Sequence, residues 1–281
     1  MIEYIIIAIL QGFFEWLPIS SSGQVMIVSI AFFGISPAEA FSLAIWLHMG
    51  TMLAVLLKYR IDYYNIIKSI FFNKEKNSKK TINERNWLII ATIGTAITAL
   101  PLYFVFKIIL EDYFSATQGD IITLIIAGLL IITGVIILLT KKLTGKKTVE
   151  DLSEKFFQSD SLISGLAQGV SILPGVSRSG VTVSSILLQN YTQNNALKLS
   201  FLISVPAVIG SVVADVLFGS GSVFGTLDLS VILISTGVSF IVGYLSIEGL
   251  LKLAKRINFG YFCIIYGLIA FFIIIPFLFL T

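Results

Sequence analysis

Two short stretches, Ser20-Ser21-Ser22-Gly23 and Ser177-Arg178-Ser179-Gly180, interrupt two otherwise apolar segments of the chain. Each follows a Gln-Gly pair at the same interval, Gln11-Gly12 in the first copy and Gln168-Gly169 in the second, and the copies lie 157 residues apart. Identical residues at equal spacing in matching apolar surroundings indicate two structurally related halves. The breaks are the most polar, turn-prone parts of their segments, so they decide how each half folds.

The composition is that of a membrane protein. Of the 281 residues, 56% are hydrophobic and only 12% are charged, whereas soluble domains carry about 25% charged residues. Several apolar runs reach the ~20 residues that a helix needs to cross a bilayer. We therefore expect one integral membrane domain over residues 1–281, surrounded by the lipid bilayer, with no nucleic-acid partner. The first apolar run has no basic segment before it, so no cleavable signal peptide is expected.

Each break is flanked by two apolar pieces that are too short to span a membrane comfortably. In the first half these are residues 1–17 and 24–33, and in the second half they are residues 162–173 and 181–188. Two half-length pieces around a polar break predict a re-entrant helical hairpin. Such a backbone is tolerated at membrane depth only where it is buried in protein or lines a cavity.

Three longer apolar runs follow each hairpin, at 40–57, 87–106 and 121–140 and again at about 197–218, 229–250 and 259–280. The sequence thus predicts an all-α fold of six transmembrane helices and two re-entrant hairpins, with repeat one over about 1–140 and repeat two over about 158–281. Because each half has an odd number of spans, the second half would enter the membrane from the opposite side. In such inverted-topology repeats the site lies where the broken helices meet, near the bilayer midplane.

The basic residues orient this arrangement. All of the 19 Lys and Arg residues except Lys107 and Arg178 fall on one face, mostly in the loops 58–86 and 141–160. The loops of the other face carry acids: Glu39, Glu111, Asp112, Asp120 and Asp228. The positive-inside rule places the basic face in the cytoplasm. We expect a multi-pass plasma-membrane protein with both termini external, hairpin one entering from outside and hairpin two from the cytoplasm.

Arg178 is the only arginine inside an apolar segment. A central arginine costs roughly 2.5–3.5 kcal/mol on insertion scales, so it usually faces a cavity and marks a functional site. Its planar guanidinium can grip a phosphate or a carboxylate with two hydrogen bonds. Arg178 is therefore expected to bind an anionic ligand, and an internal ion pair with Glu15 is the alternative; the two can coexist.

The serines of both breaks stand where a short helix begins. Serine is a favoured N-cap, and the unpaired N–H groups at a helix start attract anions. Two such starts, near Gly23 and near Gly180, that converge on the guanidinium of Arg178 would form a cradle for a phosphate or diphosphate. The alternative is that the serines only cap their helices.

Three further polar residues lie in apolar helices. Glu15 follows Gln11 by four residues, so both project from one helical face; Glu15 could be a general base, a metal ligand or the partner of Arg178. His48, the sole histidine, lies near the middle of the first span and could make an interhelical hydrogen bond or carry a proton. Of the remaining acids, Asp160 is expected to cap the first helix of hairpin two and Asp215 to lie at the membrane interface.

These residues resemble a known family. The stretch from Gln11 to Gly23 resembles the first signature of the undecaprenyl-diphosphatase (bacitracin-resistance) family, and Pro174-Gly175-Val176-Ser177-Arg178-Ser179-Gly180-Val181-Thr182 is similar to its second, P-G-x-S-R-S-G-x-T. A third, less specific stretch is Leu47-His48-Met49-Gly50-Thr51. The resemblance covers essentially the whole chain, with hairpins and spans in the family order.

The resemblance implies that the protein removes one phosphate from a polyprenyl diphosphate and leaves the monophosphate carrier lipid, at a site open to the outer face. It implies a divalent cation, Mg²⁺ or Ca²⁺, and allows a homodimer. Carried over by position, Glu15 is a catalytic or metal-associated carboxylate, Ser21 the nucleophile and Arg178 the diphosphate anchor. With His48 as the third catalytic candidate, the substrate-binding candidates are Arg178, Gln11, Ser20, Ser22, Gln24, Ser177, Ser179, Gly180 and the supporting Thr182.

Two positions depart from the family pattern. Gln24 stands where the family usually has histidine, and glutamine cannot accept or donate the proton that a hydroxyl nucleophile requires. Either Glu15 or His48 then takes that role, or water attacks instead, or the protein no longer hydrolyses. Gln11 stands where many members have glutamate, which removes one potential metal ligand. The alternative function is a polyprenyl-phosphate transporter of the same fold, because paired broken helices in inverted repeats are also a transporter architecture.

Overall fold

The computed structural model describes residues 1–71, 78–110, 119–140, 145–149, 154–219, 222–256 and 259–278. The described residues are almost entirely helical and contain no strand beyond one isolated bridge between Lys147 and Tyr191. In chain order the helices are α1 (Ile2–Phe14), α2 (Ser21–Phe33), α3 (Pro37–Lys58), α4 (Arg60–Phe71), α5 (Lys79–Ile108), α6 (Gly119–Thr140), α7 (Glu154–Gly169), the 3-10 turn η5 (Val170–Ile172), α8 (Arg178–Leu188), α9 (Gln193–Phe218), α10 (Val223–Thr226), α11 (Leu229–Arg256) and α12 (Phe259–Leu278).

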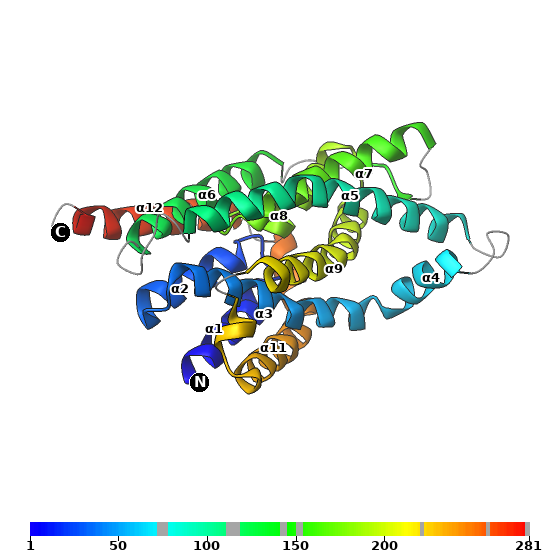
Figure 1. Ribbon diagram of the computed structural model, residues 1–281. Coiled ribbons are helices and arrows are strands. Elements are labelled where there is room, and N and C mark those ends of the chain that lie inside the picture. Colours follow the sequence, from blue (N-terminus) through cyan, green and yellow to red (C-terminus); the bar gives the residue numbers. More distant parts are fainter. Residues whose placement is uncertain are drawn as a thin grey trace.

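Five of the described helices, α3, α5, α6, α9 and α11, are long and apolar enough to cross a membrane. This confirms the all-helical, membrane-type fold that the sequence predicts. The sixth span is expected at α12, but the described apolar stretch there is only the shorter segment Gly260–Phe272. The sixth span therefore stays a prediction. Figure 1 shows α3, α5, α6 and α12 running roughly parallel, with α4 at one end of the molecule.

The basic segment 58–86 contains more helix than the hydropathy pattern indicates. Helix α4 lies within the segment 58–86 that the sequence analysis treats as a loop, and α5 begins at Lys79 rather than near 87. Ser78 caps α5, because its hydroxyl accepts a hydrogen bond from the Thr81 N–H at 3.2 Å. Hydropathy marks only the apolar length of a helix, so it misses these polar turns. Among the loop charges used for orientation, Lys74, Lys76, Glu111, Asp112, Lys141 and Lys142 lie outside the described residues.

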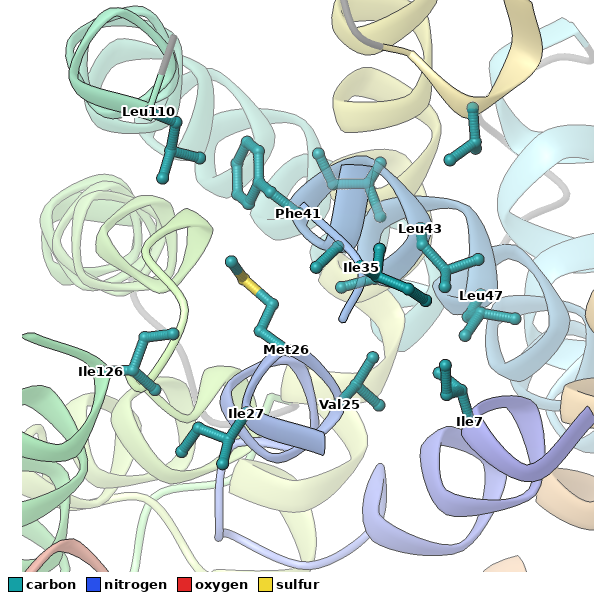
Figure 2. Close-up of a cluster of buried hydrophobic side chains, with 14 of the residues drawn as sticks. Ile7, Val25, Met26, Ile27, Ile35, Phe41, Leu43, Leu47, Leu110 and Ile126 are labelled. Atoms are coloured by element: carbon teal, nitrogen blue, oxygen red, sulfur yellow. The ribbon is translucent and has the colours of Figure 1, made fainter. Parts of the chain in front are cut away.

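The first hairpin lies in the interior of the bundle. Val25 and Met26 of α2 are fully buried and belong to a cluster that also contains side chains of α1, α3 and α6. Figure 2 shows Val25 and Met26 between Ile126 of α6 on one side and Leu43 and Leu47 of α3 on the other. The first turns of α2 are buried, whereas Phe32 at its far end is exposed, so the hairpin holds its polar tip inside the protein.

Each hairpin packs against the other half of the chain. Helix α1 runs along α11, and α7 runs along α5. A Cβ on Gly12 would come within 2.7 Å of the Ser239 carbonyl oxygen, and one on Gly169 within 2.6 Å of the Thr95 carbonyl oxygen. The glycine of each Gln-Gly pair therefore allows two helix backbones to approach closely, as small residues do in membrane helix pairs.

Two acids have partners that the sequence does not reveal, and one of them, Asp160, is placed differently from the expectation. Asp160 lies inside α7 and is not its cap; it accepts hydrogen bonds from the Tyr191 hydroxyl at 3.2 Å and from Lys147 Nζ at 3.3 Å. Asp215 is buried near the end of α9, where Ser42 and Ser222 each donate to its Oδ2 at 2.7 Å. Both acids have partners from distant segments, which hydropathy along the chain cannot show.

Candidate functional site

The tips of the two hairpins touch. The Gly175 N–H donates a hydrogen bond to Ser20 Oγ at 3.0 Å, and Ser179 Oγ lies 3.5 Å from the Leu17 carbonyl oxygen. A Cβ on Gly23 would come within 2.9 Å of the Gly175 nitrogen, so glycine is needed where the tips meet. The meeting of the tips expected from the repeated motif is therefore observed.

Both short helices begin at this junction with the same cap. Ser20 adopts a left-handed conformation (φ 57°, ψ 79°) and its hydroxyl accepts from the Gly23 N–H at 3.4 Å, which caps α2. Ser177 caps α8 in the same way, accepting from the Gly180 N–H at 3.1 Å. The first serine of each motif thus serves as N-cap, and the remaining N–H groups of the first turns give both helix starts a partial positive charge.

Glu15 is the centre of the site. Its Oε2 accepts hydrogen bonds from Ser21 Oγ at 2.6 Å and from Gln11 Nε2 at 2.7 Å, and it lies 3.2 Å from His48 Nε2. Its Oε1 pairs with Arg178 Nη2. The carboxylate is only 6% exposed, so a buried charge is here fully surrounded by donors, as its desolvation requires. The expected ion pair of Glu15 and Arg178 is formed.

The hydrogen bonds of His48 restrict its protonation. His48 Nδ1 lies 2.5 Å from the Ala44 carbonyl oxygen, which can only accept, so Nδ1 carries a hydrogen. The other ring nitrogen, Nε2, faces the Glu15 carboxylate at 3.2 Å. His48 is therefore held beside Glu15 in an orientation that allows proton exchange between the two groups.

A cavity of about 240 Å³ opens above this cluster. Its floor is polar, and Arg178 reaches it with a side chain that is 15% exposed. The walls are mostly apolar and come from α3, α5, α9 and η5. The predicted site residues that line the cavity are Glu15, Ser20, Ser21, Ser22, His48, Ser177, Arg178 and Ser179. A polar, positively charged floor beneath apolar walls suits an anionic head group with an apolar tail.

The other four predicted site residues do not line the cavity. Gln11 lies behind Glu15, and the Gly180 N–H is used by the cap of α8. Gln24 is buried, and its side-chain amide donates to the Ile19 carbonyl oxygen at 3.3 Å. Thr182 is fully buried in α8, and its hydroxyl has no hydrogen-bond partner among the described residues. These four residues therefore lie outside the cavity lining, next to residues that form it.

Gln168 lines the cavity, although the sequence analysis places it only in the repeated motif and not among the predicted site residues. Its Nε2 donates to Thr95 Oγ1 and to the Ile203 carbonyl oxygen, both at 3.1 Å. The signal was available, because Gln168 occupies the position of Gln11 in the second copy of the motif. The repeated glutamine thus takes different partners in the two hairpins.

The site contains few carboxylates that could bind a metal ion. Among the described residues there is no group of three or more His, Cys, Asp or Glu side chains that could hold a metal ion. Glu15 is the one acid in the cavity lining, and both its oxygens face donors. These residues do not form a metal cage of their own, since Mg²⁺ and Ca²⁺ require several oxygen ligands.

Comparison with known proteins identifies the family. A family model described as bacitracin resistance protein BacA matches residues 4–272. A protein of Methanothrix thermoacetophila named undecaprenyl-diphosphatase is 41% identical over 268 residues, which cover 95% of this chain and 94% of that relative. A protein of the same name from Methanococcoides burtonii is 36% identical over 274 residues, with 95% and 96% covered. The chain therefore belongs to the BacA family of bacitracin resistance proteins.

Proposed function

We propose that the protein hydrolyses an undecaprenyl-type polyprenyl diphosphate to the polyprenyl monophosphate and inorganic phosphate. The names of the relatives support this reaction. The observation that carries it to this chain is the hydrogen bond from Ser21 Oγ to Glu15 Oε2 at 2.6 Å, beside Arg178 on the cavity floor. A hydroxyl paired with a carboxylate next to a cation is the arrangement of an activated nucleophile facing a phosphate.

The positive charge of the floor holds the diphosphate. Arg178 can turn from Glu15 to phosphoryl oxygens, which form comparable bidentate pairs with a guanidinium. The starts of α2 and α8 add N–H groups at the same place. Phosphoryl transfer depends mainly on positioning and charge stabilisation, so these groups supply the larger part of the rate enhancement.

Ser21 performs the chemical step. Its oxygen forms a bond to the terminal phosphorus, the bridging P–O bond breaks, and the polyprenyl monophosphate leaves. The hydroxyl proton passes to Glu15, which accepts the hydrogen bond of Ser21, and from there to the departing monophosphate. Water then attacks the phosphoserine and gives a proton to Glu15, the Ser21 P–O bond breaks, Ser21 Oγ takes that proton from Glu15, and inorganic phosphate is released. Gln24 takes no part, because it lies outside the cavity lining.

A divalent cation, Mg²⁺ or Ca²⁺, belongs to the same proposal. With Glu15 as the one carboxylate of the lining, the ion would arrive with the diphosphate and take most of its ligands from phosphoryl oxygens and water. When bound, it would neutralise charge that develops on those oxygens.

The site is proposed to lie in an inverted repeat of six spans and two re-entrant hairpins. The reciprocal packing supports this, since α1 of the first half contacts α11 of the second as α7 of the second contacts α5 of the first. A pseudo-two-fold axis that exchanges the halves produces this pattern. In Figure 1 the start of α1 and the end of α12 both lie away from α4, in keeping with external termini and a cytoplasmic α4.

The cavity is proposed to open at the outer face of the plasma membrane. Lys198 at the start of α9 pairs with Asp62 of α4 and with Glu84 at the start of α5, both at 2.7 Å. These contacts hold α4 and the starts of α5 and α9 together, and this end of the molecule, which carries most of the basic residues, is called the basic end. The cavity lining follows α5 over Thr92–Tyr103 and α9 over Pro206–Ala214, towards the opposite ends of these helices. The positive-inside rule makes that opposite end external.

Phosphate release tests the reaction directly. Purified protein in detergent is given a short prenyl diphosphate with Mg²⁺, and an Arg178→Ala variant serves as control. We expect release by the wild type and a loss of roughly 10²–10³-fold in the variant, the range for removing one charge-stabilising group. If the wild type releases no more phosphate than the variant, hydrolysis is rejected. A leaflet-exchange assay in liposomes would then measure transport of polyprenyl phosphate, the alternative function.

A further inference from the structure

Helices α5 and α9 are in contact on both sides of the cavity. Towards the basic end, Trp87 and Ala91 of α5 belong to one buried cluster with Leu199 and Ile203 of α9. Figure 1 shows the two helices crossing towards the end where α4 lies. This contact closes the space between α5 and α9 at the end nearest α4.

The opposite ends of the two helices are joined by aromatic side chains. The Tyr103 hydroxyl lies 3.5 Å from the Ala214 carbonyl oxygen, and the rings of Phe104 and Phe218 meet edge to face with centroids 5.1 Å apart. Asp215, held by Ser42 and Ser222, fixes this part of α9 to α3. The edge away from α4 is therefore closed as well.

Between the two contacts the cavity lining reaches the outer surface of the protein. Leu100 lines the cavity, is 44% exposed, and continues the outward apolar row of Ile93 and Ile97 on α5. Gly210 also lines the cavity, and its neighbours on the outward side of α9, Ile209 and Val213, are about half exposed. At Leu100 and Gly210 the cavity wall and the lipid-facing surface are therefore the same surface.

The opening is bordered by small side chains. On α5 these are Ala96 and Ala99, and on α9 they are Ala207, Gly210 and Ser211. Beside them, Pro206 cannot donate to the Leu202 carbonyl oxygen one turn earlier, and the Tyr63 hydroxyl donates to that oxygen instead at 2.6 Å. The backbone of α9 is thus stabilised from outside the helix next to Pro206.

We propose that this opening between α5 and α9 is the binding site of the first isoprenyl units of the lipid substrate. The inference rests on the proposed function and adds the path of the tail. The diphosphate lies on the floor by Arg178, the chain passes between Ala99 and Gly210, and the remainder extends into the bilayer. Small apolar side chains leave room for the methyl branches of an isoprenoid, and the closed edges above and below restrict the chain to this level.

Gly210 sets the width of the opening. A Cβ placed there would meet no other atom within 4 Å, so a larger side chain would extend into the opening without displacing protein atoms. Gly237 of α11 has the same open surroundings but does not line the cavity. Gly210→Leu and Gly237→Leu therefore form a matched pair with equal cost to helix formation.

The KM of each variant, Gly210→Leu and Gly237→Leu, is measured with substrates that differ in tail length. We expect Gly210→Leu to raise the KM for undecaprenyl diphosphate by roughly tenfold or more, in the range by which misfitting apolar groups are discriminated. The KM for methyl diphosphate, which has no isoprenoid tail, should stay unchanged, and Gly237→Leu should resemble the wild type with both. An equal effect of Gly210→Leu on both substrates, or none on the long one, would overturn the proposal.

A cross-linking experiment separates this inference from the reaction itself. A prenyl methylenediphosphonate, which cannot be hydrolysed, carries a diazirine on its second isoprenyl unit and is photolysed with the protein in nanodiscs. Adducts on residues 96–100 of α5 and 207–211 of α9 are expected by mass spectrometry. Adducts confined to other helices would reject the tail site even if phosphate release is intact. Adducts at the expected residues in a protein that releases no phosphate would reject the hydrolase and retain the tail site.

Discussion

The two hairpins, α1–α2 and α7–α8, are built alike and carry different chemistry. In both, a glycine after glutamine packs against a helix of the other half, and the first serine of the break caps a short helix. Yet Arg178 occupies in the second hairpin the position that Ser21 has in the first, 157 residues earlier. Glu15 likewise corresponds to the apolar Ile172.

The residues shared by the two hairpins have a structural role, and the residues that differ between them form the site. The residues common to both copies, such as Gly12 and Gly169, fix how the hairpins pack and where they meet. The residues that differ supply an acid and a hydroxyl from one hairpin and a cation from the other. Neither hairpin contains the full set, so the site exists only where the two tips touch. Three predictions test this division.

The largest effect is expected at Glu15, the acid found only in the first hairpin. Glu15→Gln keeps the shape but removes the charge that pairs with Arg178 and accepts the proton of Ser21. We expect kcat for phosphate release to fall by roughly 10²–10⁴-fold, the range for losing a general base. Glu3→Gln, at the exposed start of α1, is the control. A Glu15→Gln enzyme with kcat near the wild-type value would show that the acid is structural only.

An intermediate effect is expected at the shared glycines. Gly12→Ala and Gly169→Ala each place a Cβ within 2.7 Å of a backbone oxygen of the facing helix. We expect each to destabilise the protein by about 1–3 kcal/mol, as for overpacking of a tight contact, and so to lower Tm in detergent. Gly225→Ala, where a Cβ meets no atom within 4 Å, should leave Tm unchanged. A fall in Tm for only one of the two glycines would argue against equivalent roles in the two hairpins.

The smallest effects concern the proton carrier. His48→Gln should lower kcat by about tenfold, because His48 lies 3.2 Å from Glu15 and can take part in proton transfer. Gln24→His should leave turnover unchanged, because Gln24 is buried away from the cavity lining. A rise in turnover for Gln24→His would instead place proton transfer on α2. The two variants together decide which helix carries the histidine function in this chain.

Much of the fold follows from local pattern. The serines and glycines of Ser20–Gly23 and Ser177–Gly180 mark the starts of α2 and α8 because capping depends on neighbours within one turn. The long apolar runs at 40–57 and 121–140 predict α3 and α6 within a few residues. Helix α4 was missed because its polar residues give no span signal, although Tyr63 and Ile66 are buried against the bundle.

The sequence by itself indicated the membrane class and the two hairpins, and it offered an ion pair of Arg178 and Glu15 as one of two alternatives, because composition, spacing and the cost of a buried charge are readable along the chain. Only the tertiary structure decided that His48 rather than Gln24 stands beside Glu15, that Asp215 is buried, and that α5 and α9 border an opening. Each of these depends on which distant helix faces a side chain. That is set by packing between helices, which no local pattern encodes.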